Sequence, residues 1–199
     1  MNLIITNSFM ELIFGTHNRN KIIEINKILP SGFVLKSLTD LNYNSKIEET
    51  GTTLEQNALI KVRTIFKTFK KDCFADDSGL EVSALGGKPG VYSARYAGGH
   101  RNAEDNTQKI LEELKGVNDR QAQFRTVIAM ILGGAEYLFE GIIKGEISNR
   151  PLGKNGFGYD PIFIPEKQGL TFAQLTLTEK NKISHRSRAF EKLIKFLIR

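Results

Sequence analysis

Two long β-patterned segments joined by a pair of glycines place the strongest constraint on how this chain can fold. Residues 124–132 and 136–147 are rich in β-branched and aromatic residues, and Gly133-Gly134 lies between them. Two glycines at such a junction favour a tight hairpin, because hairpin turns need positive φ angles. The chain is therefore expected to contain a sheet with at least one antiparallel pair of strands.

Strand and helix patterns alternate along the rest of the chain. Thr52 and Glu55 form the pattern of a capping box at a helix start, and helical spacing of apolar residues precedes Pro30. Together with the hairpin, this alternation predicts a mixed α/β fold without an internal repeat. The other expected elements are strands at 11–14, 33–35, 73–75 and 162–164, and helices over 21–29, 52–69, 102–114 and 184–198.

Length and composition indicate a single globular domain. The 199 residues suffice to bury a substantial core, and the contents of 40% hydrophobic and 25% charged residues are near the average for soluble proteins. No apolar stretch approaches the length of a membrane span, so no membrane partner is expected. The single cysteine, Cys73, rules out an internal disulfide framework and favours a reducing compartment, which predicts a cytoplasmic location.

The formal net charge of +6 is compatible with nucleic acid, an anionic small molecule or a solvated surface as its cause. No run of Lys and Arg exceeds two residues, which weakens the case for a nucleic-acid partner. We therefore expect no nucleic acid as partner.

The polar turn at 16–21 lies between an expected strand and an expected helix. Such a turn offers backbone N–H groups and the positive end of a helix dipole to a phosphate, and Lys21 adds a full charge. The plainer alternative is an ordinary helix cap by Asn18 followed by a solvated lysine.

Acidic residues gather at two places in the sequence. The segment 76–79 follows the apolar strand at 73–75 and is expected to end it, with 80–82 able to continue the strand beyond. A simple turn needs only one Asx residue and a glycine, so a pair of aspartates there suggests chemistry. Concentrated carboxylates favour a hard divalent cation such as Mg²⁺, although an acidic loop alone is more often only solvated. The four carboxylates are Glu48, Glu49, Asp76 and Asp77.

Two further segments contain candidate binding residues. In 156–161, two glycines allow close backbone approach and Phe157 or Tyr159 offers a face for a stacked base, unless these rings fill the core. In 184–186, Ser184 is a natural helix cap, yet cations in a first helical turn oppose the helix dipole. His185 and Arg186, with Lys180 just upstream, therefore suggest recognition of a base carbonyl or an anion.

These segments, in this order, closely resemble the inosine triphosphate/xanthosine triphosphate pyrophosphatase family, the non-canonical purine nucleoside triphosphate pyrophosphatases. The resemblance covers nearly the whole chain from about Glu11. Its most specific part runs from Asp76-Asp77-Ser78-Gly79-Leu80 through Gly86-Gly87-Lys88-Pro89-Gly90-Val91-Tyr92-Ser93-Ala94-Arg95-Tyr96, supported by Phe157-Gly158-Tyr159-Asp160-Pro161 and Ser184-His185-Arg186.

The resemblance implies an elongated mixed β-sheet flanked by helices, two lobes with a central substrate cleft, and a homodimer. It implies Glu48 or Glu49 with Asp77 as ligands of Mg²⁺, Asp77 as general base, and Asp76 and Lys21 as further catalytic residues. The residues that it implies for substrate binding are Thr16, His17, Asn18, Arg19, Asn20, Lys21, Ser78, Phe157, Gly158, Tyr159, Asp160, Lys180, His185 and Arg186.

The expected reaction is hydrolysis of purine nucleoside triphosphates (ITP, dITP and XTP) to the monophosphate and pyrophosphate, which cleanses the nucleotide pool. A carboxylate deprotonates water, and Lys21 stabilises the departing pyrophosphate. Donors of His185 and Arg186, if left unpaired against a 6-amino group, would select 6-oxo purines by about 1 to 3 kcal/mol. The family turn usually has Gly where Asn20 stands, and Asn tolerates a left-handed backbone there.

Three alternatives stay open at this point. A related pyrophosphatase could prefer pyrimidine or modified pyrimidine triphosphates, a non-catalytic nucleotide sensor would lack a carboxylate, and a basic nucleic-acid-binding protein would bind with strong salt dependence. The resemblance also predicts that residues 1–9 are an extension before a single domain at 10–199, with Met10 as the biological start. The alternative is that residues 3–5 pair as an edge strand.

Overall fold

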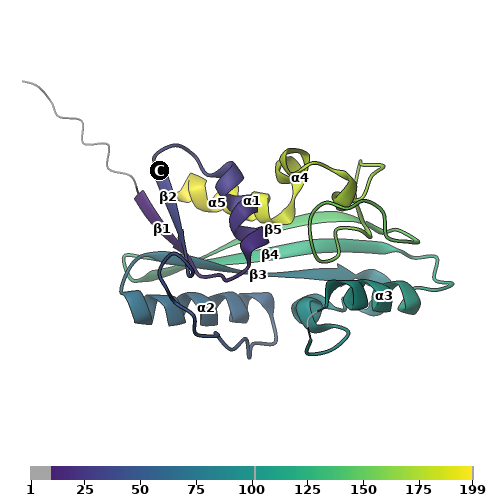
Figure 1. Ribbon diagram of the computed structural model, residues 1–199, viewed down its shortest axis with the longest axis horizontal. Coiled ribbons are helices and arrows are strands. Elements are labelled where there is room, and N and C mark those ends of the chain that lie inside the picture. The colour runs from purple at the N-terminus through teal and green to yellow at the C-terminus, as the bar shows by residue number, and fades with distance from the viewer. Residues whose placement is uncertain (1–9, 101, 199) are drawn as a thin grey trace, which may run out of the picture.

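The computed structural model describes residues 10–100 and 102–198. The strands form one six-stranded sheet in the order β2-β1-β3-β4-β5-β6, and β3, β4 and β5 run along the long axis of the molecule (Figure 1). The strands are β1 (Met10–Phe14), β2 (Phe33–Ser37), β3 (Cys73–Val82), β4 (Gln121–Leu132), β5 (Ala135–Ile147) and β6 (Phe163–Pro165). The helices are α1 (Arg19–Ile28), α2 (Leu54–Phe69), α3 (Ala103–Glu113), α4 (Leu177–Ile183) and α5 (His185–Leu197).

The sheet is mixed, as the hairpin and the strand–helix alternation predicted. β1 runs parallel to β2 and β3, whereas β3, β4, β5 and β6 pair antiparallel. Gly133 and Gly134, at φ angles of 57° and 84°, make the tight turn between β4 and β5. The predicted fold class is therefore confirmed, while the division into two lobes stays a prediction.

The pairing of β1 with β3 is short, and this opens one side of β3. The register joins only Ile13 with Cys73 and Phe14 with Phe74, and the N–H of Gly15 then bonds the carbonyl of Phe74. Beyond this point the chain turns away from β3 into α1. β3 continues past Phe74 without β1 beside it, so the residues that follow Phe74 in β3 can line a pocket.

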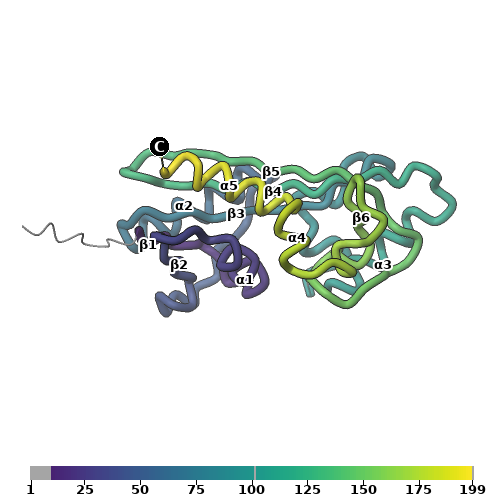
Figure 2. Tube along the Cα trace, turned by 90° about the horizontal axis from the view of Figure 1, so that it is seen from above, coloured from purple at the N-terminus to yellow at the C-terminus, as the bar shows by residue number. Residues whose placement is uncertain are grey.

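Three clusters of buried apolar side chains hold the helices to the sheet. One lies between α2 and one sheet face and another between α1, α5 and the opposite face. The third fills the far end, where α3 and the segment 150–175 pack on β3, β4 and β5. Figure 2 shows α3 and β6 at one end of the molecule and β1, β2 and α2 at the other. The middle of β3 therefore lies between the ends.

The strand expected to end before Asp76 instead continues to Val82, so that prediction was wrong. β3 pairs with β4 without a break from Cys73–Ile131 to Val82–Ala122. Gly79 serves close packing here, because a Cβ atom would lie 2.4 Å from the carbonyl oxygen of Gly90. The two aspartates stay in a buried strand because cations from neighbouring helices pair with them, as described below.

Smaller differences concern helix boundaries. The cap of α2 is Thr53, whose side chain accepts a hydrogen bond from the N–H of Gln56, and not Thr52. α4 was not expected from the sequence, and it begins with its own capping box of Thr176 and Glu179. The predicted extension at 1–9, with its alternative edge strand, lies outside the described residues. Within the described residues, no helix is long and apolar enough to cross a membrane.

Candidate active site

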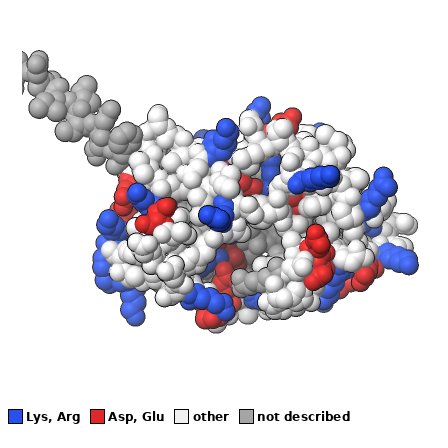
Figure 3. Space-filling view, viewed as in Figure 1, with Lys and Arg blue, Asp and Glu red and all other residues white. Residues whose placement is uncertain are grey.

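A cavity of about 510 Å³ opens beside the middle of β3. Figure 3 shows a recess near the centre of the molecule, with acidic and basic residues around it. The cavity is lined by most of the residues that the sequence singled out. These are Thr16, His17, Asn18, Asn20, Lys21, Glu49, Asp77, Ser78, Phe157, Gly158, Tyr159, Asp160, Lys180, His185 and Arg186.

A larger groove of about 730 Å³ lies elsewhere, lined by the ends of β3, β4 and β5 and by the segment around β6. Its lining includes Gln123 and Lys144 but none of the residues predicted to act. We therefore place the candidate site in the smaller cavity.

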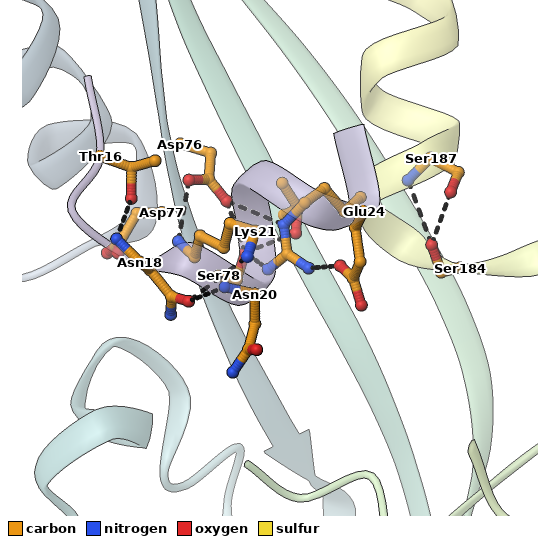
Figure 4. A network of polar contacts seen from close by, with 12 residues as sticks. Thr16, Asn18, Asn20, Lys21, Glu24, Asp76, Asp77, Ser78, Ser184 and Ser187 are labelled. Carbon is orange, nitrogen blue, oxygen red and sulfur yellow. Dashed lines mark hydrogen bonds and ion pairs between the residues drawn. The ribbon is translucent and has the colours of Figure 1, made fainter. Parts of the chain in front are cut away.

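The turn before α1 forms one wall of the cavity. Asn18 caps the helix, since its Oδ1 accepts from the N–H groups of Asn20 at 3.0 Å and Lys21 at 3.3 Å, and Thr16 Oγ1 accepts from Asn18 N–H (Figure 4). These two helix amides are thus occupied, so a phosphate here would meet side chains and the helix dipole. Arg19 does not line the cavity.

Asn20 does not need the left-handed backbone that the sequence suggested. It lies in the first turn of α1 and is not among the described residues with positive φ. The turn therefore accommodates Asn in place of the family's Gly without using the tolerance for a left-handed backbone that the sequence suggested.

Asp76 lies below the cavity at 2% exposure and is held by cations. Lys21 Nζ is 2.8 Å from Asp76 Oδ1, and Arg186 Nε is 3.2 Å from Oδ2, which also accepts from the hydroxyl of Ser78 (Figure 4). Burial would raise the pKa of Asp76, but Lys21, Arg186 and Lys61 outweigh it and hold this pKa below its ordinary value. A carboxylate held this firmly in its charged form is a better anchor for Lys21 and Arg186 than a proton acceptor.

A second carboxylate, Glu24, continues this network and was not predicted. It pairs with Arg186 through Nη1 and with Lys180 at 2.7 Å. Lys180 also pairs with Asp160 at 2.5 Å. Burial raises the pKa of Asp160 despite that lysine. Three acidic and three basic groups thus alternate in one buried network.

This network explains why two residues of basic type begin α5. Arg186 is neutralised by Glu24 and Asp76. Burial, with the charges of Arg186 and Lys180, lowers the pKa of His185 well below its ordinary value, so that its ring is neutral. The unfavourable interaction with the helix dipole is therefore largely removed.

Asp77 faces the opposite side of the sheet from Asp76, because side chains alternate along a strand. Lys61 of α2 lies 3.0 Å from Asp77 Oδ1 and also 3.0 Å from Glu49 Oε1. Asn57, one turn before Lys61, donates to Asp77 Oδ2 at 3.1 Å. Despite burial, these carboxylates and Asp76 raise the pKa of Lys61. Asp77 therefore has a fixed orientation at the cavity wall.

Lys61 and Asn57 were missed in the sequence. Both belong to the buried side of α2, together with Leu54, Ala58 and Val62. A lysine and an asparagine four residues apart within an apolar helix face were the available signal, since buried polar groups need partners.

The geometry shows which of the two adjacent glutamates, Glu48 or Glu49, lies at the cavity. Glu49 lines the cavity and shares Lys61 with Asp77, whereas Glu48 is 69% exposed and pairs with Lys46 at the surface. Among the described residues, no group of three or more His, Cys, Asp or Glu side chains could hold a metal ion. Two carboxylates still fit Mg²⁺, which usually takes one or two from the protein and further oxygens from substrate phosphates and water.

The opposite end of the cavity offers an aromatic face and a neutral imidazole. Phe157 lies under the cations of Lys180 and Arg186, whose charged atoms are 4.8 and 5.6 Å from its ring centre. His185 stacks on Phe124 at 4.6 Å, and its buried Nδ1 has no hydrogen-bond partner in the described structure.

Tyr159 is 5% exposed and belongs to the core cluster at the far end, with its hydroxyl donating to the carbonyl of Ser93. Of the two candidate stacking rings, Phe157 is thus the one available to a base.

Comparisons with known proteins agree over almost the entire chain. A dITP/XTP pyrophosphatase of Christiangramia forsetii is 53% identical over 188 residues, covering 94% of this chain and 99% of that protein. Another, of Bacillus subtilis, is 48% identical and covers 94% and 96%. The solved structure of the Staphylococcus aureus Ham1 protein has a TM-score of 0.85 at 42% identity, with 94% of this chain and 97% of that chain covered. A HAM1 protein from Coxiella burnetii has a TM-score of 0.86 at 39% identity, covering 96% and 99%. The profile of the Ham1 family matches residues 12–196, and the chain belongs to this family.

Proposed function

We propose that this chain hydrolyses non-canonical purine nucleoside triphosphates, such as dITP, ITP and XTP, to the monophosphate and pyrophosphate. The observation that carries the proposal is a single cavity with Lys21 and the Glu49–Lys61–Asp77 group at one end and Phe157 with a neutral imidazole at the other. Relatives about half identical to the chain have the name dITP/XTP pyrophosphatase.

Asp77 is the proposed general base. It would orient a water molecule and remove its proton as the water oxygen attacks the α-phosphorus, and the bond to the bridging oxygen of pyrophosphate would break. Asn57 and Lys61 hold the Asp77 carboxylate in one orientation, which favours reaction by limiting misplacement of the water.

Glu49 and Asp77 are the proposed ligands of Mg²⁺, which would neutralise polyphosphate charge and polarise the phosphorus when bound. Lys21 would stabilise the departing pyrophosphate. Its pKa is lowered by burial against the attraction of Asp76, so Asp76 limits the loss of charge that burial would cause.

We assign selection of the base to the end of the cavity that contains Phe157 and His185. Phe157 offers a stacking face, and the unpartnered Nδ1 of His185 offers a hydrogen bond to a purine edge. Arg186 and Lys180 place positive charge next to that face, which suits the carbonyl oxygen of a 6-oxo purine.

We further propose that the protein is a homodimer in the cytoplasm. The dimer rests on the resemblance to the pyrophosphatase family, whereas the cytoplasmic location rests on the single cysteine, since a reducing environment suits a buried free Cys73. Light scattering on the purified protein tests the proposed dimer. A monomeric mass at micromolar protein concentration would refute it.

Product analysis tests the activity itself. With dITP and Mg²⁺ we expect dIMP and pyrophosphate, whereas dIDP and phosphate would overturn the assigned position of attack. Parallel assays with dATP and dUTP separate purine selection from a preference for pyrimidines. Asp77→Asn is the matched control, because the amide keeps the shape of the carboxylate and loses its basicity.

A further inference from the structure

His17 lies in the phosphate-side turn, yet its contacts go to another loop. Its ring is nearly parallel to that of Tyr43, with centres 6.2 Å apart and an angle of 13°, and its Nε2 is 3.3 Å from the carbonyl oxygen of Ser45. Offset stacking of this kind is favourable at such separations. His17 thus joins the turn before α1 to the loop that follows β2.

The loop at 38–51 contains the proposed metal ligand Glu49. Its first part is fixed by a hydrogen bond from Tyr43 N–H to the Leu38 carbonyl, and its end by one from Gly51 N–H to Asn57 Oδ1. Tyr43 in turn packs edge-on against Phe69 of α2 at 5.8 Å. Tyr43 is therefore a firm support for His17.

Between these fixed points the loop is tied to the site by side chains. Lys61 pairs with Glu49, and His17 meets Ser45 four residues earlier. The pair of Lys46 with Glu48 is highly exposed and joins only loop residues to each other. Other supports of the loop, such as Ile47 in the core beside α2 and Arg95 at 4.0 Å from Glu49, come from other elements. His17 joins the loop to the turn before α1, in which Lys21 lies four residues further on.

We propose that His17 is a positioning residue that holds the 43–49 segment against the phosphate-side turn and so sets where Glu49 lies relative to Lys21. In this proposal His17 keeps Glu49 and Lys21 in a fixed relative position and does not bind phosphate, in contrast to the substrate-binding role that the resemblance implied for it. The expected effect on catalysis rests on the proposed function, whereas the contact that holds the loop does not depend on that function.

Hydrogen exchange measured by mass spectrometry tests the tether without any substrate. His17→Ala is expected to speed exchange of amides in 43–49 about three- to tenfold, as expected for loss of one aromatic pair, while peptides of β4 stay unchanged. Unchanged exchange in 43–49 would overturn the proposal.

Steady-state kinetics test the consequence. For His17→Ala we expect the Mg²⁺ concentration at half-maximal rate to rise about three- to tenfold, with kcat at saturating Mg²⁺ within about twofold of the parent. A fall in kcat without faster exchange of the loop would instead show that His17 acts on the phosphates. Hydrogen exchange in the loop could respond as expected although the parent protein hydrolyses no triphosphate. That outcome would refute the proposed function and leave the contact between His17 and the loop supported.

Variants of Tyr43 provide matched controls. Tyr43→Phe keeps the ring and should behave as the parent, whereas Tyr43→Ala should reproduce the changes seen in His17→Ala. The double variant His17→Ala/Tyr43→Ala should be no worse than the more affected single variant, and additive effects would contradict a shared role. Should His17→Ala fail to fold, His17→Asn, which also lacks the ring, replaces it in the same measurements.

Discussion

Asp76 and Asp77 are neighbours in β3, and their carboxylates lie on opposite faces of the sheet in two different charge environments. Asp76 pairs with Lys21 and Arg186, while Asp77 pairs with Lys61. Two adjacent carboxylates that would repel each other in a turn are thereby separated by the alternation of a strand. One is suited to anchor cations and the other to take part in the reaction.

Asp77→Asn should lower kcat for dITP by about 10²- to 10⁴-fold, because the amide cannot take a proton from water. The fold should persist, since the amide oxygen can still accept a hydrogen bond from Asn57 and Lys61 keeps Glu49 as a counter-ion. Turnover and the circular dichroism spectrum check this on one preparation. Turnover near that of the parent in a folded variant would remove Asp77 from the mechanism.

Asp76→Asn should instead destabilise the protein, by about 3 to 5 kcal/mol, because Lys21 and Arg186 would lose a buried counter-ion. Urea unfolding of the two asparagine variants provides the comparison. An Asp76→Asn protein as stable as Asp77→Asn would contradict the role of Asp76 as anchor.

The stability that Asp76 contributes should depend on pH with a defined sign. The pKa of Asp76 is lowered in the folded state from an ordinary value of 3.8, so the unfolded chain takes up the proton first. The contribution is complete above the unfolded pKa and is lost as pH falls below it toward the folded pKa. Melting temperatures between pH 2 and 6, taken as about the range of carboxylate titration, should therefore fall less steeply for Asp76→Asn than for the parent. Equal slopes would show that other carboxylates govern acid unfolding.

The two adjacent glutamates offer a matched test of the metal end. Glu49→Gln should raise the Mg²⁺ concentration needed for half-maximal rate by about tenfold or more, because a charged oxygen ligand is lost next to Asp77. Glu48→Gln should change nothing, since Glu48 pairs with Lys46 at the surface. Equal effects of both changes would refute the selection of Glu49.

The elements that sequence patterns predicted well are those whose signals are local. The hairpin of β4 and β5 follows from Gly133-Gly134, and α3 and α5 follow from their caps Asn102 and Ser184 and from helical spacing. Boundaries such as that of β3 were mispredicted because an aspartate pair normally marks a turn. Only cations supplied by α1, α2 and α5 allow the pair to remain inside a strand.

The difference between local signals and contacts from distant elements also applies to the candidate active site. Lys21, Asp77, His185 and their neighbours were predicted from motifs, and the structure brings them to one cavity, while their individual roles stay predictions. Lys61 was signalled only by its place on the apolar face of α2, and Glu24 resembles an ordinary helix charge, since nothing local shows that it will meet Arg186 across 162 positions of the chain. Partners that come from distant elements are set by tertiary packing, and helical periodicity does not encode them.

Phe157 and Tyr159, two aromatic residues separated by one glycine, provide a test of base binding at their end of the cavity. Phe157→Leu should raise KM for dITP by a factor corresponding to about 1 to 3 kcal/mol, the usual loss when a stacking face for one base is removed. kcat should change less, because the phosphate end is untouched. Tyr159→Phe, in contrast, removes only the hydroxyl that donates to the Ser93 carbonyl in the core, and should lower stability by about 1 kcal/mol without changing KM. Initial rates over a range of dITP concentrations, with thermal melts of both variants, measure the two effects. An unchanged KM for Phe157→Leu would show that Phe157 is not the ring on which the base stacks, and a raised KM for Tyr159→Phe would show that the Tyr159 hydroxyl acts on substrate.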